Sequence, residues 1–317
     1  MTTRSPLTAC LLAQMLVVLC VLPTLADRKV TRSRAPQTWD PETERLFEAN
    51  PLDLLKGQRP AAGGRSQSGG PDQPGSATPA KSGSSGALAW SDLISAAVIS
   101  DEIKAHRLTV AESVRSPAVF RSGGNRKLRQ QFSVIAVMFG ISAQYEADVR
   151  WKQIAAAARD SFARAARNAK AADQNTFRES KARSDDLDEL VRGGSVEFDQ
   201  PEEKVLWSDV AQRRPLMARL KQAHEERLRP WTANQGEFER HLDEIRHEAE
   251  VLAALSEVIK HEEYEFYDDD VYVDYCSQMQ DHAGTVSQAA KDKNLAEAQR
   301  AVGEISKVCS ECHEGYR

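Results

Sequence analysis

The sequence predicts an all-α protein built as two tandem antiparallel four-helix bundles. Apolar residues recur every three or four positions beyond residue 87, which is the period of an amphipathic helix. The same stretch contains no alternating runs rich in Val, Ile and Thr of the kind that predict strands. It also repeats itself once, which indicates two copies of one helical unit.

Length and composition agree with two modest domains and exclude several function classes. The chain has 317 residues, of which 41% are hydrophobic and 28% charged, and its formal net charge is −5. A nucleic-acid-binding protein would need a basic face, so we expect no nucleic-acid partner. Five cysteines are too few for a disulfide scaffold.

Residues 1–26 have the pattern of a secretory signal peptide. Arg4 precedes an apolar run from Leu7 to Leu22. Thr24 and Ala26 then place small residues at the −3 and −1 positions of a cleavage site. The run is short for a membrane span, so we expect cleavage rather than an uncleaved anchor. The mature protein would be exported, in a bacterium to the periplasm, and would not span the membrane.

Two further segments precede the predicted bundles. Residues 27–55 are mixed and charged and receive no assignment. Residues 56–86 are rich in Gly, Pro and Ser and can bury little apolar surface, so they predict a flexible linker. The two bundles would then cover residues 87–200 and 201–317.

The internal repeat has an offset of 117 residues. Residues 88–93, LAWSDL, correspond to residues 205–210, VLWSDV, and the apolar run 134–138 corresponds to 251–255. Each copy is divided by breaker residues into four helical segments. We predict helices over roughly 88–112, 126–147, 149–172 and 176–192 in the first copy, and over 207–229, 237–262, 270–291 and 294–313 in the second.

The C-terminus carries the motif CxxCH, formed by Cys309, Cys312 and His313. This is the attachment signature of c-type haem. Residues i, i+3 and i+4 share one helix face, so both thiols can reach the vinyl groups of one porphyrin while the histidine reaches the iron. A redox dithiol would need a βα context, and a zinc site would need two more nearby ligands. We therefore predict one covalent haem c.

Residues 205–317 resemble the class II c-type cytochromes, the cytochrome c′ family. The resemblance rests on CxxCH near the end of the last predicted helix, with Tyr316 and Arg317 behind it. It implies a four-helix bundle with His313 as the proximal iron ligand and with Tyr316 and Arg317 at the haem site. The alternative for Arg317 is a solvated chain end.

The resemblance leaves the sixth iron position open. Family members either leave it vacant behind apolar side chains or fill it with a Met from the first helix. Met217 lies in the first predicted helix of the second copy and shares a face with His224, another possible ligand. The alternative role of Met217 is ordinary core packing.

The first copy lacks the motif. We expect it to serve packing, partner binding or positioning, including packing of the two bundles on each other. The acidic and aromatic run 262–270 is either a solvated loop or a docking patch for a basic redox partner. The residues that correspond to the two cysteines and the histidine are Val191, Gly194 and Ser195.

These features predict an exported c-type cytochrome rather than an enzyme. It would carry single electrons between redox partner proteins that the sequence does not identify. One alternative is the binding of a small gas, NO or CO, at a five-coordinate haem. The other is a non-redox helical binding or scaffold protein whose CxxCH holds zinc or nothing.

Overall fold

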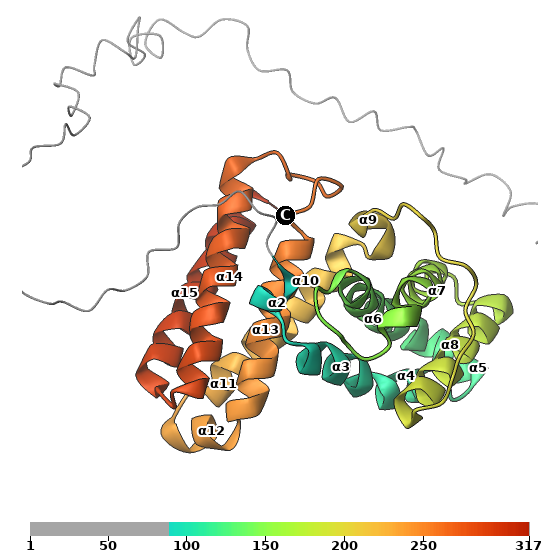
Figure 1. The fold of residues 1–317 in the computed structure, drawn as a ribbon, viewed down its shortest axis with the longest axis horizontal. Coiled ribbons are helices and arrows are strands. Elements are labelled where there is room, and N and C mark those ends of the chain that lie inside the picture. The colour runs from blue at the N-terminus through green and yellow to red at the C-terminus, as the bar shows by residue number, and fades with distance from the viewer. Residues whose placement is uncertain (1–88, 317) are drawn as a thin grey trace, which may run out of the picture. The chain divides into compact units, whose positions relative to one another are not determined.

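The computed structural model describes residues 89–316, and every regular element in that range is a helix (Figure 1). The all-α prediction is therefore confirmed for this range. The predicted signal peptide, the segment 27–55, the linker 56–86 and Arg317 lie outside the described residues. Within the range, no helix is long and apolar enough to cross a membrane.

The N-terminal half of the described chain contains four longer helices and several short ones. The short helix α2 (Trp90–Leu93) is followed by α3, α6, α7 and α8 as the main elements. The bounds are α3 Ala96–Ala105, α4 Arg107–Ser113, α5 Pro117–Val119, α6 Asn125–Gln144, α7 Ala155–Asn168 and α8 Gln174–Arg192.

The C-terminal half follows the same order. A π-helical turn, η5, continues α10, so that the first long helix of this half changes its winding. The bounds are α9 Trp207–Val210, α10 Arg213–Lys221, η5 Gln222–Leu228, α11 Arg229–Trp231, α12 Gln235–Arg240, α13 Leu242–Val258, α14 Asp270–Lys291 and α15 Leu295–Gly315.

The helices repeat with the offset found in the sequence. The first residues of α9, α10 and α13 lie 117 positions after those of α2, α3 and α6. Helix α6 packs against α7, α13 packs against α14, and α14 packs against α15. Helices α14 and α15 run side by side in Figure 1. Between the halves, α10 packs against α6 and α3 packs against α13. Both halves belong to one compact unit, and the boundary at residue 200 stays a prediction.

The first predicted helix of each copy is interrupted, which the sequence analysis missed. Ile94 and Ala211, which correspond at the offset of 117, are both extended, with φ near −146° and −147°. The Tyr145 hydroxyl donates to the Ile94 carbonyl at 2.9 Å, and the Tyr264 hydroxyl donates to the Ala211 carbonyl at 2.7 Å. A tyrosine from a later segment thus satisfies the carbonyl at each break, at equivalent places in both halves.

Candidate functional site

A cavity of about 1060 Å³ lies among α10, η5, α13, α14 and α15 in the C-terminal half. Its volume slightly exceeds the range of about 300–1,000 Å³ that is usual for pockets of small molecules and cofactors. Apolar side chains from four of these elements form much of its wall. They are Leu220, Leu252, Ile259, Met279 and Val308.

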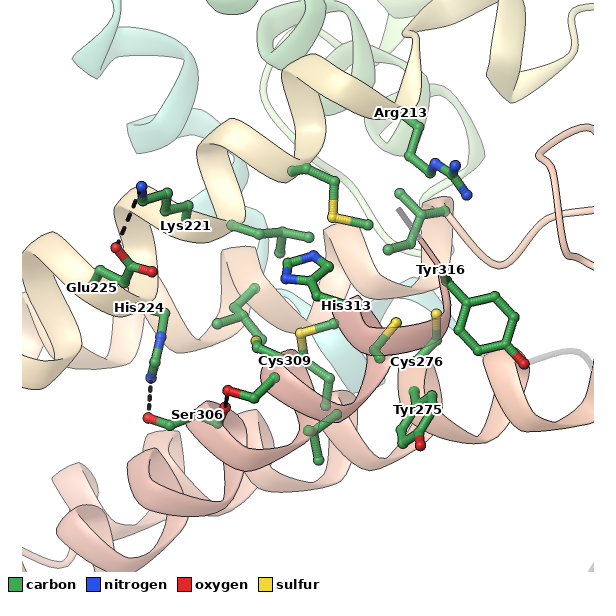
Figure 2. A pocket seen from close by; sticks show the side chains of 18 of the residues that line it. Arg213, Lys221, His224, Glu225, Tyr275, Cys276, Ser306, Cys309, His313 and Tyr316 are labelled. Atoms are coloured by element: carbon green, nitrogen blue, oxygen red, sulfur yellow. Dashed lines mark hydrogen bonds and ion pairs between the residues drawn. The ribbon is translucent and has the colours of Figure 1, made fainter.

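The three motif residues line this cavity together. Helix α15 runs unbroken through the motif, and Tyr316 N–H donates to the Cys312 carbonyl at 2.9 Å in its last turn. Cys309 and Cys312 are partly buried, whereas His313 is exposed and projects from α15 toward α10 (Figure 2). Helical spacing thus places the two thiols and the imidazole on one wall, as the sequence predicts.

The start of α15 also follows a local signal. Asn294 is the N-cap residue, and its side-chain oxygen accepts the Glu297 N–H at 3.2 Å. Buried Ala298, Val302 and Ile305 then anchor one face of the helix against the core. The motif is held at the end of a helix whose beginning and apolar stripe are both fixed by its own sequence.

The thiols of this cavity are protonated at neutral pH. Burial raises the pKa of Cys309 to about 11 and that of Cys276 to about 12, and it also raises the pKa of Cys312. All three are free in the structure. The C-terminal end of a helix further disfavours a thiolate, because the helix dipole is negative there. Dithiol redox sites need the opposite environment, in which the thiol pKa is lowered.

Met217 and His224 reach the same cavity from the opposite side. Met217, on α10, is only partly buried, unlike its neighbours Leu216 and Leu220. His224, on η5, is buried, and its Nε2 lies 2.9 Å from the Ser306 hydroxyl of α15. Burial lowers the His224 pKa, so the ring is neutral near pH 7. The structure therefore brings both candidate ligands to the cavity but engages His224 in a bond to α15.

Tyr316 belongs to an aromatic cluster that the sequence analysis did not foresee. Its ring lies 5.1 Å from Phe266, 5.4 Å from Tyr272 and 6.3 Å from Tyr275, measured between centroids. Burial and the nearby carboxylate of Asp269 raise the Tyr316 pKa to about 12. The run 262–270 thus contributes packing to the cavity rim, a role that neither alternative for this segment included.

Arg213 connects this cluster to α10, which the sequence analysis also missed. Its guanidinium lies 5.0 Å from the Phe266 ring centroid and 3.1 Å from a carboxylate oxygen of Glu265. Arg213, Arg214, Lys221 and Arg229 line the cavity, together with only two acidic side chains, Glu225 and Glu314. The excess of basic groups favours a ligand that carries negative charge.

The N-terminal half differs from this site in backbone as well as in side chains. Helix α8 ends at Arg192, because Gly193 adopts φ +92° and Gly194 N–H donates to the Glu189 carbonyl at 2.9 Å. This left-handed glycine ends the helix before the positions that correspond to Cys312 and His313. The first copy therefore lacks the helical frame of the motif in addition to its residues.

Comparisons with protein-family models, with curated proteins and with solved structures found no match. Among residues 89–316, no three His, Cys, Asp or Glu side chains come together as metal ligands would.

Proposed function

We propose that this protein is an exported c-type cytochrome of the cytochrome c′ type that holds one haem and transfers single electrons. Its two halves would be copies of one four-helix bundle, of which the second holds the haem. The observation that carries the proposal is the common wall of Cys309, Cys312 and His313 in a cavity of about 1060 Å³. The signal-peptide pattern at the N-terminus supports export, which c-type attachment requires.

The residues present fit a haem in size and in chemistry. The cavity has apolar walls for a porphyrin, two thiols for thioether bonds and an imidazole for the iron. Basic side chains on the same walls, among them Arg214 and Arg229, suit the two carboxylates that a haem carries.

The bound haem would supply one-electron chemistry at its iron. Cys309 and Cys312 would hold it to α15, and His313 would supply a nitrogen ligand from the same helix. Leu252 and Val308 would keep water from the ring, which tunes the potential through the local dielectric. Met217 would supply a second ligand to the iron from α10.

Binding of a small gas is the second candidate function. The observation in its favour is that the Ser306 hydroxyl engages Nε2 of His224, so this imidazole is not free to fill the sixth position through that atom. If Met217 also stays against the apolar wall, the iron would keep one open position. The two functions differ only in whether Met217 binds the iron.

An absorption spectrum of the full chain, made with c-type maturation machinery, tests both points. We expect a pyridine haemochrome typical of thioether-bound haem at one haem per chain. Cys309→Ala and Cys312→Ala should each remove a thioether bond and the double variant should lose covalent haem, whereas Cys276→Ala should retain it. Protein without haem would overturn the cytochrome proposal and favour the non-redox alternative.

Carbon monoxide then separates electron transfer from gas binding. With Met217 as ligand, the ferrous protein should be low-spin and take up carbon monoxide poorly, and Met217→Leu should make it high-spin and reactive. A wild-type protein that is already high-spin and binds carbon monoxide readily would favour the gas-binding function instead.

A further inference from the structure

Equivalent residues of the two halves meet each other across their interface. Trp90 and Trp207 lie edge to face with centroids 5.6 Å apart. Glu102 and Arg219 are also joined, with Arg219 Nε 2.7 Å and Nη2 3.0 Å from the two carboxylate oxygens. Each pair is separated by the repeat offset of 117 residues. Where two copies meet about a two-fold axis, a residue near the axis contacts its own counterpart.

The helix packing has the same reciprocity. Helix α3 of the N-terminal half packs against α13, and its counterpart α10 packs against α6, the counterpart of α13. Helix α2 likewise packs against α13, and α9 against α6. The halves therefore face each other about a pseudo-two-fold axis that passes near the two residue pairs.

The axis is occupied by a buried group of charges. The side chains of Glu102, Arg219 and Glu248 are only 1–2% exposed. Arg219 Nη1 donates to Glu248 at 2.6 Å, and Arg227 also pairs with Glu248. Burial would raise the Glu102 pKa, but Arg219 and two histidines hold it well below the ordinary value. Two carboxylates thus face two guanidinium groups.

Two histidines complete the group around Glu102. His106 Nε2 lies 3.2 Å and His247 Nε2 lies 2.8 Å from the Glu102 carboxylate. One comes from the N-terminal half and the other from α13. Both are partly buried and saturate the remaining acceptor sites of Glu102.

Only the pairing of unlike halves balances these charges. Two C-terminal halves would bring Arg219 against a second Arg219, with an Arg227 and a Glu248 from each half, leaving two positive charges in excess. Two N-terminal halves would bring Glu102 against Glu102. The N-terminal counterpart of Glu248 is Gln131, which is neutral. A buried charge without a partner is strongly destabilising, so both like pairings are disfavoured.

We infer that the N-terminal half is an intramolecular partner of the C-terminal half. The C-terminal half recognises it through the opposite charges of Glu102 and Arg219 at this axis. The haem-free half occupies the face through which two C-terminal halves of different chains would otherwise pair, and a single chain is complete by itself. The residues at this axis lie outside the CxxCH motif, so the recognition does not require bound haem.

The ion pair between Glu102 and Arg219 also supports the wall of the cavity. Arg219 lies on α10 between Ala218 and Leu220, which both line the cavity. Glu102 holds Arg219 from the other half. The pairing of the halves therefore also fixes the helix that presents Met217.

Charge reversal in the full chain tests the recognition. Glu102→Arg and Arg219→Glu should each lower Tm by about 10 °C or more, because each leaves like charges buried together. The double variant restores one charge of each sign and should recover at least half of the summed loss. Purely additive losses would contradict the inference.

The matched control is Arg107 with Asp188, a pair 2.8 Å apart within the N-terminal half and about one-third exposed. Reversing either of these charges should change Tm by only about 2–4 °C. A loss as large as at Glu102 would mean that the stability response does not report on the axis.

Mixing the variants tests specificity directly. In the Glu102→Arg chain both axis residues are basic, and in the Arg219→Glu chain both are acidic. When the two chains are coexpressed, each half finds its unlike partner only in the other chain. Light scattering should then detect a complex of two chains, while the wild type and the double variant remain single chains. Unchanged single species in the mixture, or a stable wild-type dimer, would overturn the inference.

Discussion

His224 Nε2 and Ser306 Oγ lie 2.9 Å apart, and their bond joins the π-helical turn η5 to α15 beside the cavity. Ser306 also donates its hydroxyl to the Val302 carbonyl at 3.1 Å. Ser306 thus contacts both the His224 ring and the backbone of its own helix. The bond fixes the spacing between the helix that carries the CxxCH motif and the wall opposite.

Loss of this bond should destabilise the protein. Ser306→Ala removes the hydroxyl that contacts Nε2 of buried His224, and we expect the free energy of unfolding to fall by about 1–3 kcal/mol. Ser310→Ala is the control, because the Ser310 hydroxyl makes an exposed bond to the Ser306 carbonyl in the same helix. It should change stability by no more than about 0.5 kcal/mol. Denaturant unfolding measures both, and equal effects would contradict a special role of His224.

Stability should also decrease as the pH falls through the ordinary His pKa. Burial lowers the His224 pKa in the folded protein, so the unfolded chain binds its proton first as pH drops below about 6.5. Proton binding then favours the unfolded chain. The stability associated with a neutral, buried His224 is present above about pH 6.5 and is lost below it. His224→Gln should flatten the dependence of unfolding free energy on pH between about 7 and 5. An unchanged slope would assign the titration to other groups.

Two helical glycines should respond to alanine in opposite directions. A Cβ at Gly140 would lie 2.9 Å from Trp207 Cζ3, and this indole is buried against Trp90. We expect Gly140→Ala to lower the unfolding free energy by about 1–2 kcal/mol, because the ring has little room to move. Nothing lies within 4 Å of a Cβ at Gly303. Gly303→Ala should therefore stabilise α15 by about 0.5–1 kcal/mol.

The thiols should react slowly in the folded chain before haem is attached. A rise of the Cys309 pKa to about 11 leaves about 100-fold less thiolate at neutral pH than the ordinary value of 9.0 does. A more basic thiolate is more nucleophilic, so the net slowing of alkylation should be about tenfold. Mass spectrometry of iodoacetamide-treated native and unfolded protein measures it. Fast native labelling of Cys309 would instead indicate an activated redox dithiol.

Much of the fold follows from local patterns. The apolar stripe of α15 and the N-cap at Asn294 predict that helix within two residues at either end. The repeat of 117 residues locates α9, α10 and α13 from α2, α3 and α6. The breaks at Ile94 and Ala211 could not be predicted in this way, because they depend on tyrosine hydroxyls that arrive from about 50 residues further along the chain.

The candidate site likewise combines features that helical spacing predicts with contacts that it does not predict. Helical spacing alone places Cys309, Cys312 and His313 on one face, and the haem itself stays a prediction. The aromatic cluster around Tyr316 and the approach of Arg213 join segments about 50–100 residues apart, and no periodicity encodes such contacts. A mixed acidic and aromatic run such as 262–270 therefore does not reveal that Phe266 packs inward.

Residue spacing within one helix and identity at a fixed offset are enough to predict the helical fold of residues 89–316, the internal repeat and the single CxxCH motif. The tertiary structure decided that the motif faces a large cavity and that His224 is bound to Ser306. It also decided that Glu102 meets Arg219. Those relations depend on how helices from distant segments pack. Burial then determines how strongly each ion pair or hydrogen bond affects stability.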